Sequence, residues 1–219
     1  MKFSFLIIFV NVFFINSLLL GQDESDWKLI KSCDNDIKAY VKKMPESKIN
    51  RVKIETVIEA SLSELVALLK DAENHHNWVF LNERSEIIDE ESNFKWRYYG
   101  YTKTPWPVSD RDFYTDVWLN QNETDYSVTL TSHAIPDLFP VTKDCIRIPY
   151  IYSIWTLNPI GNGSVHILFE LEVDVGGSIP TWLTNMAVTK GPVNTINGLI
   201  EELNTNKYKN FKLDYIKEM

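Results

Sequence analysis

The sequence predicts an α+β domain in which a curved antiparallel β-sheet wraps around a long C-terminal α-helix. Between residues 27 and 173, short runs alternate apolar and polar residues, which is typical of strands with one exposed face. Two of these runs meet at Asn162-Gly163, a pair that tolerates the positive φ angles of a tight hairpin. The last apolar segment has helical spacing instead. Strands followed by a terminal helix indicate an α+β fold with a cavity between sheet and helix.

The strands follow one another with a single helical interruption. They are expected at 27–32, 37–43, 51–59, 84–89, 94–101, 112–119, 126–133, 145–157 and 164–173. The interruption begins where Ser61 or Ser63 can cap a helix whose apolar residues run from Leu62 to Leu69 at helical spacing. Residues 74–78 then form a short helical turn or loop. This order favours antiparallel hairpins over a parallel sheet.

The terminal helix is expected from Ile179 to Leu203, with Ser178 as its cap. Pro180 is tolerated in its first turn, because the first amides of a helix have no partner within it. Gly191-Pro192 should kink or break this helix midway. The polar tail 204–219 suggests no special role.

Composition limits the classes of function. The 219 residues are 44% hydrophobic and carry a formal net charge of −8, which suits one domain with its own core. The negative charge argues against a nucleic-acid partner, because phosphate binding needs a concentrated basic surface. Strong electrostatic capture by anionic membranes is disfavoured for the same reason. We expect a monomer.

The first twenty-one residues resemble an export signal. Lys2 precedes a mainly apolar run that ends before Gly21, and an acidic stretch follows. We expect cleavage after Gly21, export to the periplasm or the cell exterior, and a single mature domain over 22–219. The alternative is an uncleaved anchor, since the run approaches the length of a membrane span. Cys33 and Cys145 could form a disulfide in that compartment, although two separate buried thiols are favoured.

Two motifs carry a resemblance to a known family. Residues 104–113 read TPWPVSDRDF, and residues 176–183 read GGSIPTWL at the start of the terminal helix. Together with Trp27, Trp78 and Trp155 in matching order, they make residues 25–205 similar to the bacterial type of the START (StAR-related lipid-transfer) family. The resemblance implies a helix-grip fold, START/Bet v 1-like, in which the 102–109 loop and the terminal helix close the cavity.

The function that the resemblance implies is the binding, and possible transfer or sensing, of a lipid or other hydrophobic small molecule, with transient membrane contact. Candidate cavity or lid residues are Trp96, Tyr98, Trp106, Arg111, Phe113, Val117, Trp155, Trp182, Met186 and Ile196.

Two of these candidates have alternative interpretations. Trp106, between Pro105 and Pro107, suits membrane contact or a cavity plug, or else packing on the sheet. Arg111 could meet a lipid headgroup. We favour a structural role for Arg111, as an ion pair with Asp110 or a hydrogen bond to a loop carbonyl, because an unpaired buried charge is costly.

One position pair departs from the family. Sterol-binding members carry a buried acid and an arginine in the cavity, and counting from Arg111 these positions hold Tyr98 and Val117. An apolar cavity is therefore expected without the sterol-type charge pair. The alternative function is a helix-grip enzyme of the cyclase or hydratase type. However, the sequence offers no catalytic constellation, metal-ligand spacing or cofactor motif, so we expect a non-enzyme without cofactor or metal.

Overall fold

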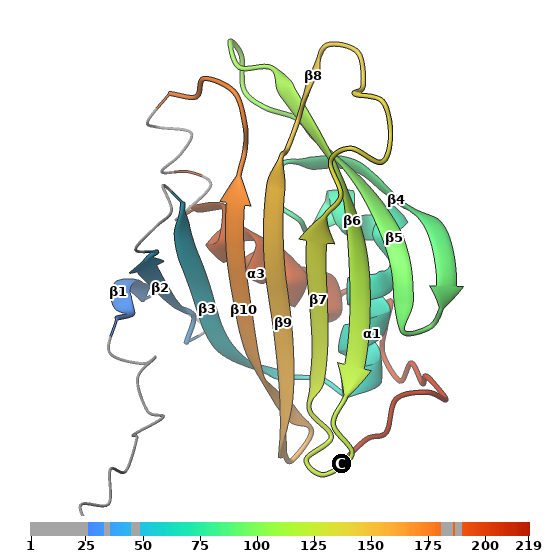
Figure 1. The fold of residues 1–219 in the computed structure, drawn as a ribbon. Helices are drawn as coiled ribbons and strands as arrows, with labels where there is room; N and C mark the ends of the chain where they lie inside the picture. The colour runs from blue at the N-terminus through green and yellow to red at the C-terminus, as the bar shows by residue number, and fades with distance from the viewer. Residues whose placement is uncertain (1–25, 33–35, 45–48, 181–185, 187–189) are drawn as a thin grey trace, which may run out of the picture.

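The computed structural model describes residues 26–32, 36–44, 49–180, 186 and 190–219. Its described part forms one ten-stranded sheet in the order β1-β2-β3-β10-β9-β7-β6-β5-β4, with β8 paired to β6 (Figure 1). Every neighbouring pair along this path is antiparallel, and the short β6–β8 pair is parallel. The strands are β1 Lys28–Ser32, β2 Lys38–Lys43, β3 Asn50–Glu59, β4 Asn82–Ser92, β5 Lys95–Thr102, β6 Asp110–Gln121, β7 Val128–Ala134, β8 Cys145–Arg147, β9 Tyr150–Gly161 and β10 Ser164–Asp174.

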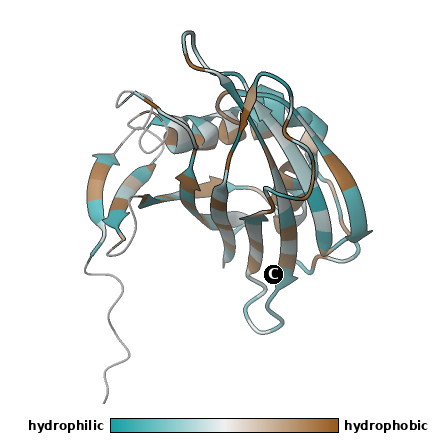
Figure 2. Ribbon diagram, turned by 45° about the horizontal axis from the view of Figure 1, so that its top comes forward, coloured by the Kyte–Doolittle hydropathy of each residue, from teal (hydrophilic) through white to brown (hydrophobic). Residues whose placement is uncertain are grey.

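The α+β helix-grip prediction is confirmed, because the sheet curves around helices on its concave side (Figure 1). Brown and teal bands alternate along the strands in Figure 2, as expected for strands with one buried face. The predicted hairpin is also present. Asn162 and Gly163 have φ angles of 53° and 70° between β9 and β10.

The single strand expected at 145–157 is instead two strands. β8 ends at Arg147 and β9 begins at Tyr150, so Ile148 and Pro149 separate them. Pro149 has no amide hydrogen to donate to a sheet ladder, which fits the interruption of the ladder at this position. The break lets β8 pair with β6 while β9 pairs with β7 and β10.

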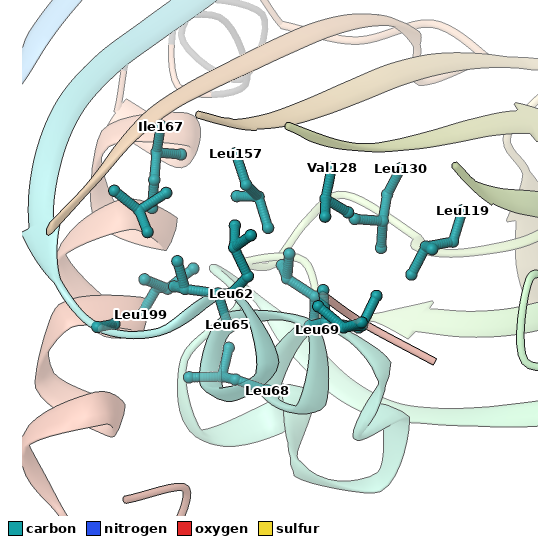
Figure 3. Close-up of a cluster of buried hydrophobic side chains, with 14 of the residues drawn as sticks. Leu62, Leu65, Leu68, Leu69, Leu119, Val128, Leu130, Leu157, Ile167 and Leu199 are labelled. Carbon is teal, nitrogen blue, oxygen red and sulfur yellow. The ribbon is translucent and has the colours of Figure 1, made fainter. Parts of the chain in front are cut away.

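Helix α1 (Leu62–Lys70) closes one end of the concave face. Ser61 and Glu64 form a capping box at its start, which identifies Ser61 rather than Ser63 as the cap. The α1 leucines pack against side chains of β6, β7, β9 and β10 and against Leu199 (Figure 3). A short 3-10 helix, η1 (Ala72–Asn77), then leads to β4.

The described part of the terminal helix is α3 (Gly191–Asn204), which crosses behind the sheet (Figure 1). Proline occupies its first turn at Pro192, where no hydrogen bond is lost. The helix start predicted at Ile179-Pro180 is wrong, because both residues lack helical structure. Gly176 and Gly177 just before them have φ angles of 67° and 70°, which belong to a turn rather than a helix. Residues 181–185 and 187–189 lie outside the described part.

The tail after α3 is a structural element rather than a featureless extension. Tyr208 and Ile216 are buried in the core that surrounds α1. The Glu218 carboxylate accepts hydrogen bonds from the amides of Leu62 and Ser63, at 3.0 and 2.8 Å. A carboxylate there satisfies free amides and favours the positive end of the α1 dipole.

Candidate functional site

A cavity of about 310 Å³ lies between the concave face of the sheet and the helices. Its walls come from most of the chain, and the majority of the lining side chains are apolar. The lining residues are Leu69, His75, Trp78, Val79, Phe80, Leu81, Trp96, Tyr98, Thr102, Thr104, Arg111, Phe113, Thr115, Val117, Leu130, Ser132, Ile148, Ile151, Ser153, Trp155, Phe169, Leu171, Val173, Val175, Met186, Gly191, Pro192 and Thr195.

The register of β5 and β6 orders this lining along the strands. Thr102 pairs with Arg111, Tyr98 with Thr115, and Trp96 with Val117. The six residue-to-residue steps from Arg111 to Val117 span roughly 20 Å at ~3.3 Å per residue. We call the part of the cavity at Arg111 the loop end, because the 102–109 loop adjoins it. The part at Trp96 and Val117 is the α1 end, since both residues share a core cluster with the α1 leucines.

A histidine–tyrosine pair lies in the wall toward the α1 end. His75 Nε2 is 3.1 Å from the Leu69 carbonyl oxygen, which can only accept, so Nε2 carries the proton. His75 Nδ1 therefore accepts from the Tyr98 hydroxyl at 3.0 Å. Burial lowers the pKa of His75 to about 4, outweighing the Leu69 carbonyl and the Asp71 charge. Burial also raises the pKa of Tyr98. Both groups are neutral at neutral pH.

The central wall combines aromatic rings with two small hydroxyl residues. Trp155 and Phe169 stack with ring centroids 4.1 Å apart across β9 and β10. Ser132 and Ser153 lie opposite each other on β7 and β9. Small side chains at these inward positions leave room that larger residues would fill.

Arg111 is the charged residue of the lining. It is 3% exposed, and strand alternation turns it inward while Asp110 and Asp112 turn to the other face. Its guanidinium donates to the backbone carbonyls of Ser109, Val175 and Gly176, the last two at 3.4 and 3.5 Å. Burial lowers the pKa of this guanidinium, and the nearby Asp110 charge opposes that shift.

Arg147, on the strand paired with the start of β6, has a hydrogen-bond acceptor for each of its guanidinium N–H groups. Arg147 binds both oxygens of the buried Asp112 carboxylate, at 2.9 and 3.0 Å. Its remaining donors reach the carbonyls of Pro136, Phe139 and Pro140. Burial alone would raise the pKa of Asp112. The hydrogen bonds from Arg147 and Thr142, together with the Arg147 charge, outweigh burial and lower that pKa. This ion pair fastens the 135–144 loop to β6 and β8.

The structure brings seven of the ten predicted site residues to the cavity. Trp96, Tyr98, Arg111, Phe113, Val117, Trp155 and Met186 line it. Their role in lipid binding stays a prediction. The sequence left two structural contacts open for Arg111, with Asp110 or with a loop carbonyl, and among the described residues its guanidinium contacts carbonyls and forms no ion pair with Asp110. Trp182 lies outside the described residues, as do residues 1–21 and Cys33. Cys145 has a free thiol.

Two predicted site residues lie elsewhere. Trp106 is 91% exposed, so it neither plugs the cavity nor packs on the sheet. Ile196 is fully buried among Ile37, Ile54 and their neighbours instead of lining the cavity. Helical spacing marks Ile196 as apolar but does not fix the rotation of α3, which turns Thr195 to the cavity.

Sequence reasoning missed several lining residues. His75 gives little signal in the sequence, because its neighbour His76 offers no second ligand on the same side of the chain. The structure buries His75 in the wall and exposes His76. Ser132 and Ser153 carried a usable signal, since each lies two residues from an inward apolar residue on its strand.

The described residues contain no group of three or more side chains placed to hold a metal ion. None of their helices is both long and apolar enough to span a membrane.

Comparison with known proteins agrees with this architecture. The START domain family matches residues 15–209. An uncharacterized protein of Pseudomonas aeruginosa is 32% identical over 174 residues, 80% of this chain and 85% of its own length. A STAR-related lipid transfer protein from Xanthomonas axonopodis is 30% identical, with a TM-score of 0.75 over 82% of this chain and 99% of that one. Human StAR-related lipid transfer protein 5 has the same TM-score at 15% identity, over 84% and 89% of the two chains. This chain belongs to the START domain family.

Proposed function

We propose that this protein binds and carries one hydrophobic small molecule, a lipid, in the cavity and performs no chemistry on it. The observation that carries the proposal is the cavity itself, about 310 Å³ and lined mainly by apolar side chains. Its volume is at the lower end of the roughly 300–1,000 Å³ typical of small-molecule sites. The STAR-related lipid transfer protein from Xanthomonas axonopodis matches this chain over 99% of its own length, and its name supports the same ligand class.

The arrangement of His75 supports a binding role over a catalytic one. Both of its ring nitrogens are hydrogen bonded, one to the Leu69 carbonyl and one to Tyr98. A general base needs a nitrogen directed at the substrate, and a pKa of about 4 makes this imidazole a weak base. His75 and Tyr98 are therefore better suited to form a fixed polar part of the cavity wall than to transfer a proton.

The loops around the loop end support transient membrane contact. Trp106 on the 102–109 loop is exposed, and so are Leu138, Phe139 and Val141 on the 135–144 loop. Both loops lie at the same end of the sheet (Figure 1). Exposed apolar residues on the loops at this end of the sheet suit an uncharged membrane surface, since the protein carries a net charge of −8. Trp106→Ser should reduce co-sedimentation with phosphatidylcholine vesicles. Equal co-sedimentation of the variant and the wild type would contradict this contact.

Affinity measured across a series of ligands tests the binding proposal. Each methylene moved from water into the cavity gains roughly 0.8 kcal/mol, or about fourfold in affinity. Displacement of the neutral probe Nile red by alcohols of increasing chain length should show this increment until the cavity is full. An affinity independent of chain length would refute burial of the chain.

A matched pair of variants locates the binding site. Ser132 faces the cavity, while its neighbour Thr131 on β7 faces the opposite side of the sheet. Ser132→Phe should abolish Nile red binding by filling the cavity, and Thr131→Phe should leave binding intact. Unchanged binding in Ser132→Phe would place the ligand elsewhere.

Export is the remaining part of the proposal. It is supported by the charged start, apolar run and Gly21 of the first twenty-one residues. Fractionation of expressing cells should find the protein outside the cytoplasm, shortened at its N-terminus. Full-length protein in the cytoplasm would contradict export.

A further inference from the structure

Arg111 and Arg147 are neighbouring buried arginines with opposite hydrogen-bonding states. All five N–H groups of Arg147 have acceptors, two of them on the Asp112 carboxylate. Arg111 uses three N–H groups, all on neutral carbonyls. Two of those contacts, at 3.4 and 3.5 Å, are longer than a well-formed hydrogen bond. Arg147 thus has the hydrogen bonding of a structural arginine, whereas two N–H groups of Arg111 have no acceptor among the described residues.

The carboxylates next to Arg111 are already engaged with other groups. Asp110 accepts from the Thr104 amide, the Tyr101 hydroxyl and Lys103. Asp112 accepts from Arg147 and Thr142. Within the described ranges, no carboxylate forms an ion pair with Arg111. A cation 3% exposed therefore faces an apolar cavity without a counter-ion.

A buried cation is stable only with compensation, and the cavity is where an anion can reach it. The two unused N–H groups belong to the terminal nitrogens of the guanidinium, whose planar geometry suits carboxylate and phosphate oxygens. From Arg111 the cavity continues roughly 20 Å along β6 to Val117, past apolar and aromatic walls. This layout matches an amphiphile with its headgroup at the loop end and its tail toward the α1 end.

We propose that the ligand is a single-chain amphiphile with an anionic headgroup, a carboxylate or a phosphate, bound by Arg111 at the loop end. This inference rests on the proposed function and specifies its ligand class. A single chain follows from the cavity volume of about 310 Å³, at the lower end of small-molecule sites. The headgroup then lies at the loop end, and the chain runs along β6 toward Val117 at the α1 end.

The test compares charged and neutral ligands of equal chain length. Displacement of Nile red at pH 8 is measured with dodecanoate, dodecyl phosphate and methyl dodecanoate. At least one anion should bind on the order of 10- to 100-fold more tightly than the neutral ester, as expected for hydrogen bonds to a charged group. Whichever anion binds more tightly identifies the headgroup. A wild-type ratio near or below one overturns the inference, and this comparison needs no variant to fold.

Variants then assign the preference to Arg111. Arg111→Met should lower the affinity for the anion far more than the affinity for the ester, so that the preference for the anion is lost, while Arg111→Lys should retain part of that preference. Arg97→Met is the matched control, because Arg97 lies on the other face of β5 and pairs with Asp116. Equal weakening of all three ligands in Arg111→Met would indicate a purely structural role and overturn the inference.

The inference and the proposed function fail in different ways. If neither the anions nor the ester displaces the probe, the cavity does not bind amphiphiles and both proposals fall. If the ester binds as tightly as the anions, the cavity binds a hydrophobic ligand and only the anionic headgroup is refuted.

Discussion

Asp112→Asn should be strongly destabilising, because it leaves a buried arginine without its counter-ion. The side chains of Asp112 and Arg147 are 0% and 7% exposed, and their two contacts measure 2.9 and 3.0 Å. Removing one partner of a buried ion pair costs about 3–5 kcal/mol. For a domain of this size, that loss lowers Tm by about 6–20 °C at roughly 2–4 °C per kcal/mol.

The assay is urea and thermal denaturation followed by circular dichroism. Asp116→Asn is the matched control. Asp116 lies on the same strand and also pairs with an arginine, Arg97, but the two side chains are 23% and 30% exposed. This half-exposed pair should contribute no more than about 1 kcal/mol. If Asp112→Asn costs no more than Asp116→Asn, burial does not set the strength of the Asp112–Arg147 pair.

Three further changes probe other parts of the fold. Neutral His75 binds a proton only on unfolding, so stability should fall by roughly 3 kcal/mol as pH drops from 6.5 to about 4. Urea denaturation at pH 7 and 4.5 measures this loss of unfolding free energy. The loss should be smaller in His75→Gln than in the wild type, and unchanged in His76→Gln. Gly198→Ala should lower Tm despite the better helix propensity of alanine, since its Cβ would lie 2.4 Å from the Trp78 carbonyl oxygen. A rise in Tm would contradict that close packing. Glu218→Gln should cost about 1 kcal/mol in urea denaturation through the lost charge at the α1 N-terminus, and no loss would dismiss this capping role.

Much of the sheet could be predicted because strand periodicity is a local property. The alternation in β3 and the Asn162-Gly163 turn specify their structures through nearest neighbours alone. Proline alone did not decide the boundary between β8 and β9, because Pro149 separates the two strands whereas Pro159 lies within β9. The tail was missed for a different reason. Tyr208 and Ile216 are isolated apolar residues among polar ones, and only the folded core around α1 gives them apolar neighbours.

In the candidate site, too, local periodicity predicted some residues, and others depend on three-dimensional contacts. Inward positions on β5 and β6 follow from strand alternation once the family resemblance at residues 104–113 sets the parity, and the structure has Tyr98 and Val117 in the cavity lining. Ile196 was not, because helical periodicity leaves the rotation of α3 about its axis undetermined. The two arginines show the limit most clearly. Arg111 and Arg147 look alike in the sequence, and only three-dimensional contacts show which one has unused donors.

Binding of a single lipid chain in the cavity is the central claim, and native mass spectrometry tests it most directly. The purified protein is incubated with phosphatidylcholine vesicles that contain dodecanoate and dodecanol, separated from them, and weighed intact. We predict a 1:1 complex with one single-chain molecule in the wild type and the bare mass in Ser132→Phe. A wild-type spectrum that shows only the bare mass would contradict the account.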